Sequence, residues 1–263
     1  MATSVEILTG AASGTAKVAL QAMREAVTAD GDHLIESATY RGGADWLVIW
    51  GAARHNEARQ QQLKAGRRAL MWDLGYIQRK KLTGYLRMAI DTDHPQAWLD
   101  RTPDDAKRLD ALDVHLRNDA NPTGPIILVG LGYQSRAYLG CPDWERRALD
   151  ALRLEFPGRA IIHRPKGQRD TTRLPFCTRD WETPIADLIK GSSLVVCRHS
   201  NCAVDAVIAG VPFRAQDGAA MWLSGKPYTV DNRQQFLRRL AWWQWKPEEM
   251  GQAWKFVKEI TRS

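Results

Sequence analysis

A polar turn between two apolar runs near the C-terminal end of the sequence could bind an anionic ligand. Leu194–Cys197 is short and apolar, as a buried parallel strand requires. The next four residues are polar: Arg198, His199, Ser200 and Asn201. Residues 202–209 then predict a helix that ends at Gly210 and that Ser200 or Asn201 would cap. Because the first N–H groups of a helix face outward at its positive end, this turn is a predicted phosphate site, unless the polar residues serve only as the cap.

A second set of polar side chains follows predicted strands in the first half of the chain. The apolar run Trp46–Trp50 leads to His55, and the run Ala69–Trp72 leads to Asp73. In a doubly wound sheet, ligands bind at the carboxyl ends of the strands. A histidine or carboxylate at this place can take a proton from a substrate hydroxyl group. The candidates for this base, in order of preference, are Asp73, His55 and Asp93.

The pair Asp91 and Asp93 follows another predicted strand, Leu86–Ile90. Two carboxylates at this spacing could hold a divalent metal ion. Asp beside Thr and Pro is also ordinary turn chemistry, so we assign no metal ligand and leave metal dependence open.

The elements that position these residues repeat the order strand, loop and helix. This repetition predicts an α/β protein with two small Rossmann-like, doubly wound domains. Residues 118–124 (NDANPTG) are the best linker candidate, which gives domains at 1–120 and 121–263. The tail predicts helices at 233–243 and 247–261, whose tryptophans would pack in a core, with stacking on nucleic-acid bases as the alternative.

Composition limits the class of protein. The chain has 263 residues with a net charge of +7, and no apolar run approaches the about 20 residues of a membrane span. The start of the chain lacks a signal sequence and the four cysteines lack disulfide spacing, so we expect a cytoplasmic protein. Residues 54–87 hold nine basic side chains against Glu57 and Asp73, which indicates an anionic partner, with DNA as one candidate. No protein partner is evident from the sequence.

The turn and helix described first resemble the nucleotide-sugar segment of GT-B glycosyltransferases. The match is Asp205-Ala206-Val207-Ile208-Ala209-Gly210-Val211-Pro212, with Asp at a position where the family usually has Glu. The resemblance implies two facing domains with a cleft between them, and terminal helices that pack back on the first domain. It also implies that the turn His199, Ser200, Asn201 and Cys202 meets the donor diphosphate and that Asp205 binds the ribose hydroxyl groups.

The start of the second predicted domain also resembles that family. The strand at 125–129 leads into a Gly-x-Gly turn, the strand at 160–163 into Arg-Pro-Lys, and the strand at 213–215 into an Asp-Gly turn. The resemblance implies phosphate, base or sugar contacts at each of these turns. The residues concerned are Gly130, Gly132, Ser135, Arg136, Arg164, Lys166 and Asp217.

The predicted function is therefore transfer of a sugar from a nucleoside-diphosphate sugar, most simply a UDP-sugar, to a hydroxyl group. The small size and basic charge are similar to those of phage enzymes that glycosylate hydroxymethylated pyrimidines in DNA, which would act in the host cytoplasm. Two alternatives stay open. One is a nucleic-acid-binding protein on a degenerate GT-B fold, and the other is an enzyme like the sugar-nucleotide epimerases.

Overall fold

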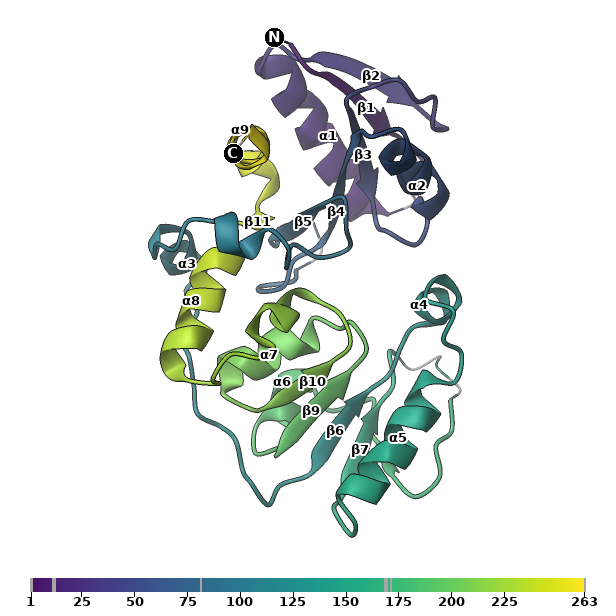
Figure 1. The fold of residues 1–263 in the computed structure, drawn as a ribbon, viewed down its shortest axis with the longest axis vertical. Coiled ribbons are helices and arrows are strands. Elements are labelled where there is room, and N and C mark those ends of the chain that lie inside the picture. The colour runs from purple at the N-terminus through teal and green to yellow at the C-terminus, as the bar shows by residue number, and fades with distance from the viewer. Residues whose placement is uncertain (1, 11–12, 81, 168–169, 171, 263) are drawn as a thin grey trace. The chain divides into compact units, whose positions relative to one another are not determined.

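The chain forms two compact units in a computed structural model that describes residues 2–10, 13–80, 82–167, 170 and 172–262 (Figure 1). Residues 1–112 and 238–263 form the first unit, and residues 113–237 form the second. The sequence-based division was 1–120 and 121–263, so the structure differs in assigning the tail from Arg238 onward to the first unit.

The sheet of the first unit is mixed. Its described strands are β1 (Ser4–Leu8), β2 (His33–Ser37), β3 (Trp46–Trp50), β4 (Arg68–Leu74), β5 (Leu86–Ile90) and β11 (Gln244–Trp245). The order across the sheet is β11-β5-β4-β3-β1-β2. β1 to β4 run parallel, whereas β5 is antiparallel to β4 and β11 is antiparallel to β5. The chain therefore winds outward from β1 in both directions, as in a doubly wound sheet.

Helices α1 (Gly14–Ala29) and α2 (Asn56–Lys64) contact the parallel strands of this sheet. The unit also contains α3 (Lys107–Ala111) and α9 (Met250–Arg262), and α8 (Val230–Ala241) crosses the boundary of the units. The Ser13 hydroxyl oxygen accepts the Ala16 N–H at 3.1 Å and so caps the start of α1. α9 packs against α1, and its Trp254 meets Trp46 of β3 edge to face at 5.5 Å. The expected return of the terminal helix to the first unit is confirmed.

The tryptophans of the tail belong to the core. Trp243 and Trp245 are fully buried, and Trp243 Nε1 donates to Thr102 Oγ1 at 2.9 Å. Trp242 stacks on Phe256 with ring centroids 5.4 Å apart. The rings thus stabilise the first unit by packing, which uses the surface that base stacking would need.

The sheet of the second unit is parallel throughout its described strands. These are β6 (Ile126–Val129), β7 (Ile161–Arg164), β8 (Thr178–Arg179), β9 (Leu194–Cys197) and β10 (Phe213–Ala215). Their order is β10-β9-β6-β7-β8. From β6 the chain builds β7 and β8 on one side and then crosses to β9 and β10 on the other. The strand order therefore reverses between β6 and β9, which is where such sheets bind ligands.

Four described helices connect these strands before α8: α4 (Tyr133–Tyr138), α5 (Trp144–Glu155), α6 (Ile185–Ile189) and α7 (Cys202–Ala209). α5 packs Trp144, Leu149 and Leu152 on the face of the sheet that carries Leu128 and Val196. Right-handed crossovers place α6 and α7, which contact each other, on the opposite face. α7 ends at Gly210, which has the left-handed φ of 75° that favours glycine, as the sequence predicted.

None of the helices in the described ranges combines the length and the apolar character needed to cross a membrane.

Candidate functional site

The carboxyl edge of the second sheet gathers the binding candidates of this unit. The turn after β6 carries Gly130 and Gly132, and the turn after β7 carries Lys166. The turn after β9 carries His199, Ser200 and Asn201, and the one after β10 carries Asp217. Because the four strands are parallel, these turns lie along one edge, with the first and third on either side of the point where the strand order reverses.

Gly130 has a packing reason to be glycine. A Cβ atom at this position would lie 3.0 Å from His163 Nε2 and 3.3 Å from Pro165 Cα. The turn therefore lies directly against the β7 strand, and a larger side chain would push the two apart. At Gly132 a Cβ would lie 3.4 Å from Lys166 Cγ, which places the lysine beside the turn.

Lys166 and Arg198 are the unpaired cations of this edge. Neither has a carboxylate partner within the described part of the chain, and one buried nitrogen of the Arg198 guanidinium has no hydrogen-bond acceptor there. Burial raises the pKa of the Cys197 thiol to about 12, and the charge of Lys166 opposes that rise. Arg198 directly follows β9. Arg198 was not among the residues singled out from the sequence, because a sequence does not reveal which arginines lack a partner.

Two other predicted cations are already engaged. Arg164 donates to the backbone carbonyl of Asp180 at 3.2 Å. Arg136 pairs with Glu145 and with Asp170, the latter at 3.1 Å, and the bond with Glu145 is the main reason that the pKa of Arg136 is raised. The structure thus turns Arg136 toward protein carboxylates, although the sequence pointed to a diphosphate. Ser135 lies half-buried in the same short helix.

The turn after β9 is fixed by its own hydrogen bonds. The Ser200 hydroxyl oxygen accepts the Cys202 N–H at 3.2 Å, whereas the N-cap residue of α7 is Asn201, which makes no side-chain capping bond. The Arg198 carbonyl accepts the N–H groups of Gln216 and Asp217 at 3.0 and 2.9 Å, which joins this turn to the one after β10. The Asp217 carboxylate accepts the N–H of Gly218 at 2.6 Å, as an Asp-Gly turn does.

Asp205 lies in the first turn of α7 and lines a groove of about 410 Å³. Ile189 of α6 and Ile208 of α7 form part of its apolar wall, and His115 and Arg117 belong to its polar rim. An apolar groove with a few polar groups is the usual form of a small-molecule site. Asp205 is therefore one of the polar groups of this groove.

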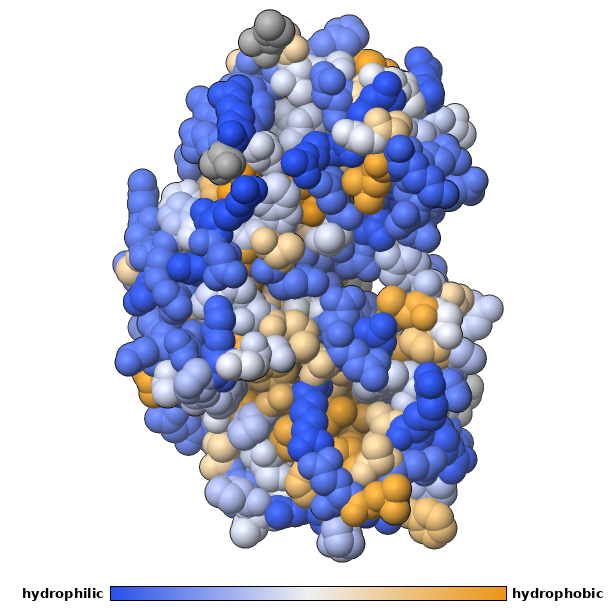
Figure 2. Space-filling view, viewed as in Figure 1, coloured by the Kyte–Doolittle hydropathy of each residue, from blue (hydrophilic) through white to orange (hydrophobic). Residues whose placement is uncertain are grey.

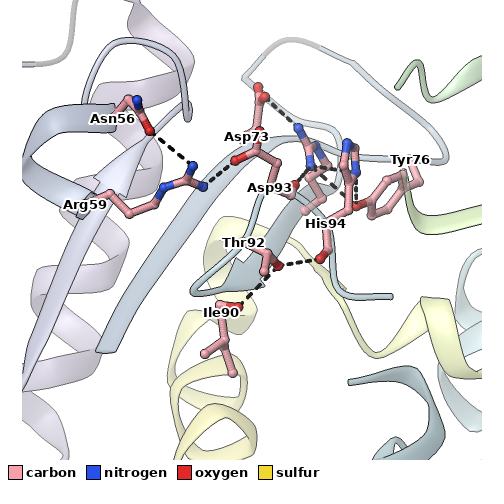
Figure 3. A network of polar contacts seen from close by, with 9 residues as sticks. Asn56, Arg59, Asp73, Tyr76, Ile90, Thr92, Asp93 and His94 are labelled. Carbon is pink, nitrogen blue, oxygen red and sulfur yellow. Dashed lines mark hydrogen bonds and ion pairs between the residues drawn. The ribbon is translucent and has the colours of Figure 1, made fainter. Parts of the chain in front are cut away.

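In the first unit, buried arginines connect the candidate bases (Figure 3). Arg87 of β5 pairs with Asp73 of β4 at 3.0 Å and donates to the backbone carbonyl of Asp93. Arg59 of α2 pairs with the Asp93 carboxylate. Tyr76 Oη lies 2.9 Å from His94 Nδ1, and Arg87 Nη1 lies 3.2 Å from the same nitrogen. Each carboxylate of this network thus faces an arginine.

The strand that leads to Asp93 runs opposite to the direction that the sequence suggested. Since β5 is antiparallel to β4, its end lies beside Ala69 at the amino end of β4, and the Asp91 N–H donates to the Ala69 carbonyl at 2.8 Å. Asp91 also pairs with Arg68. The chain then turns back, which brings Asp93 to Arg59 and Arg87.

These contacts do not suit a metal ion at the Asp-x-Asp sequence. Asp91 and Asp93 are each neutralised by an arginine, and a cation would have to displace it. Within the described ranges, no cluster of three or more His, Cys, Asp and Glu side chains could hold a metal.

His55 is the base candidate without an ion pair. It stands at the start of α2, and its side chain makes no capping hydrogen bond. Burial and, to a smaller degree, the charge of Arg54 lower the pKa of His55. The imidazole is therefore neutral at physiological pH and able to accept a proton, whereas the Asp73 carboxylate is held by Arg87.

The basic block at residues 54–87 divides in the structure. Arg59 and Arg87 are buried and paired with aspartates, so they cannot meet an external anion. The exposed members include Arg54, Lys64 and Lys80, and the surface over α2 is predominantly hydrophilic (Figure 2). The block thus offers fewer charges to a partner than its composition indicates.

Comparison with solved structures identifies the fold. The beta Kdo 2,7 transferase of Thermosulfurimonas dismutans KpsC matches with a TM-score of 0.54 and 15% identity, over 97% of this chain and 99% of that one. The beta Kdo 2,4 transferase of the same protein matches with a TM-score of 0.54 and 12% identity, over 92% and 90%. No family model and no curated protein matches the sequence. The chain thus has the GT-B-like α/β fold that was expected, with the architecture of two solved glycosyltransferases.

Proposed function

We propose that this protein is a glycosyltransferase that uses a nucleotide-sugar donor. The fold agrees with that of two glycosyltransferases. The observation that carries the proposal is the pair Lys166 and Arg198, two cations without a described carboxylate partner at the carboxyl edge of the second sheet. Arg198 directly follows β9, beside the point where the strand order reverses. A buried, unpaired arginine nitrogen is costly unless an external acceptor completes it.

The chemistry follows from this placement. The acceptor oxygen forms a bond to the anomeric carbon of the donor sugar while the bond from that carbon to the phosphate oxygen breaks. The electron pair of the broken bond stays on the phosphate, whose growing negative charge Lys166 and Arg198 would stabilise. The acceptor hydroxyl loses its proton to a base.

For this base we propose His55 of the first unit, in preference to Asp73. His55 is neutral and makes no ion pair, whereas Asp73 would have to give up its bond to Arg87 to act. Since the pKa of His55 lies below the usual histidine value of about 6.5, the base is available throughout the range above that pH.

Uridine diphosphate sugars are the donors with which we would begin. The acceptor is proposed to be anionic. The Kdo named for the two similar structures belongs among the sugars to be tested. DNA containing hydroxymethylated pyrimidines is an acceptor to test, because Arg54, Lys64 and Lys80 are exposed on the first unit.

The first experiment is a calorimetric and thermal-shift panel of nucleoside mono- and diphosphates and nucleotide sugars. We expect one nucleotide to raise the melting temperature by several degrees and Arg198→Gln to remove most of this shift. The matched control is Arg214→Gln, since Arg214 is an exposed arginine of the same unit that is paired with Glu155. If no nucleotide binds the wild type while DNA binds tightly, the transferase proposal fails and the nucleic-acid-binding alternative replaces it.

The second experiment measures sugar transfer by His55→Gln. Loss of a general base lowers kcat by about 100-fold or more, while the donor affinity should stay unchanged. His33→Gln serves as the control, because His33 is an exposed histidine of the same unit. Turnover of the donor in the absence of any acceptor would instead favour the epimerase-like alternative.

A further inference from the structure

A buried carboxylate holds the glycine turn of the second unit from one side. Glu145 lies in the first turn of α5 and is 1% exposed. Its Oε1 accepts the backbone N–H of Leu131, the middle residue of the turn, at 2.8 Å. Arg136 Nε donates to the two carboxylate oxygens at 3.1 and 3.3 Å, and the other nitrogen of its fork, Nη2, donates as well. One side chain therefore connects α5, α4 and the turn that joins β6 to α4.

The contacts of Glu145 are energetically coupled. A buried carboxylate is costly unless it is paired, and here Arg136 neutralises it with fork geometry. The N–H of Leu131 belongs to a turn and has no ladder partner, so the carboxylate supplies the acceptor that burial requires. Arg136 Nη2, which donates to Glu145, also donates to Asp170 at 3.1 Å, so one nitrogen joins the two carboxylates.

Strand β7 also restrains the turn. Gly130 N donates to the Arg164 carbonyl of β7 at 2.8 Å, and a Cβ at Gly130 would lie 3.0 Å from His163 Nε2. The turn is thus held between α5 and β7, and it has little freedom to move unless one of these contacts breaks.

We propose that Glu145 and Arg136 are positioning residues, which hold the Gly130–Gly132 turn in the shape that meets the donor. This inference rests on the proposed function. Neither residue contacts the donor in this proposal, so Arg136 acts through the turn and not as a ligand of the diphosphate. Lys166 depends on the same arrangement, because it lies beside Gly132.

The helix α5 supplies a matched control at its other end. Glu155 also binds an arginine, Arg214, through both carboxylate oxygens. The two members of that pair are about half exposed and lie away from the glycine turn. Glu145 and Glu155 thus share residue type, helix and ion-pair partner type, and they differ in burial and in the bond to the turn.

The experiment compares Glu145→Gln with Glu155→Gln in the full chain. The glutamine oxygen can still accept the Leu131 N–H, but Arg136 loses the charge of Glu145 and keeps that of Asp170. We expect the affinity for uridine diphosphate, or for the nucleotide that the panel identifies, to fall about tenfold in Glu145→Gln, since a charge-assisted bond contributes about 1.5 kcal/mol. Glu155→Gln should bind like the wild type.

Two further readouts separate positioning from a general loss of stability. Hydrogen exchange of the peptide covering 130–136 should become faster in Glu145→Gln and not in Glu155→Gln. The donor KM should rise while the acceptor KM stays constant. Arg136→Gln is the second variant and should reproduce both effects if Glu145→Gln does not fold.

The outcomes distinguish the two proposals. If the wild type binds a nucleotide and both Glu145→Gln and Arg136→Gln bind it equally well, the positioning role is overturned and the proposed function stands. If the wild type binds no nucleotide, the proposed function fails, and the positioning role fails with it.

Discussion

Two sets of cations, one in each unit, are used in opposite ways. In the first unit, Arg59 and Arg87 are buried and each is matched to an aspartate. In the second unit, Lys166 and Arg198 stand at the carboxyl edge without a carboxylate partner among the described residues. Both sheets are doubly wound, so the difference does not come from topology. The difference depends on whether a carboxylate side chain lies next to the cation, as Asp93 and Asp73 do in the first unit.

This difference separates stability from binding. A buried ion pair is costly to break, because removing one partner leaves the other charge without compensation. An unpaired cation has no such compensating partner in the fold and remains available to an anion from outside. We therefore expect substitutions in the first set to change the free energy of unfolding, and those in the second set to change ligand affinity.

The largest effect is expected for Arg87→Ala. This substitution leaves Asp73 unpaired and removes the donor to the Asp93 carbonyl. The cost should be about 3 kcal/mol, the lower end for buried pairs, because the Asp73 side chain keeps 35% exposure. Urea unfolding followed by tryptophan fluorescence measures it, with the exposed Arg41→Ala as control. A loss below about 1 kcal/mol would contradict the structural role of the pair.

A smaller effect, on binding alone, is expected for the double variant Lys166→Gln with Arg198→Gln. The free energy of unfolding should change by less than about 0.5 kcal/mol, as for surface substitutions. Nucleotide affinity should fall about 30-fold or more, or about 2 kcal/mol, and its dependence on salt should weaken. Isothermal titration at two salt concentrations measures both quantities. A destabilised variant with intact affinity would remove the contrast between the two units.

The smallest effect concerns a buried histidine in each unit. His163 is fully buried, and neither ring nitrogen has a hydrogen-bond partner in the described part of the chain. Burial lowers its pKa below the usual value of about 6.5. Above pH 6.5 both folded and unfolded forms are neutral, so His163 contributes no pH dependence. As the pH falls below 6.5 the unfolded chain binds a proton first, and stability decreases by up to about 1.4 kcal/mol per pH unit.

Unfolding at pH 7.5 and 5.5 tests this sign. The wild type should lose about 1 kcal/mol more than His163→Leu between these values. At pH 7.5 the leucine variant should be at least as stable, because an unpaired polar group is replaced by an apolar one. His94→Leu is the comparison in the first unit and should be destabilised at both pH values, since His94 bonds to Tyr76. An equal acid loss in the wild type and His163→Leu would exclude His163 as the source.

The sequence predicted the elements whose signals are local. Strands β3 and β5 have the predicted bounds, and Gly210 ends α7 as expected. The apolar spacing of the tail correctly placed its tryptophans in a core. Such features depend on residues that are close in the chain, so periodicity and end signals suffice to find them.

Features that depend on pairing between distant residues were missed. The direction of β5 is set by its pairing with β4. β11 consists of two residues that pair with β5, although the whole second unit separates the two strands in the sequence. β2 has a polar edge-strand pattern that gives little signal. The roles of Arg136 and Arg198 depend on which carboxylates come near in space, which spacing along the chain does not show.

The discontinuous first unit has a consequence for synthesis on the ribosome. β11 and α9 emerge only after the second unit has been made. At a synthesis rate of about 5–20 residues per second, β5 would remain an uncovered sheet edge for on the order of 10 s. Trp46 would lack its ring contact with Trp254 for at least as long. Uncovered edges invite pairing with other chains, so this interval is when a nascent molecule is most exposed to misassembly.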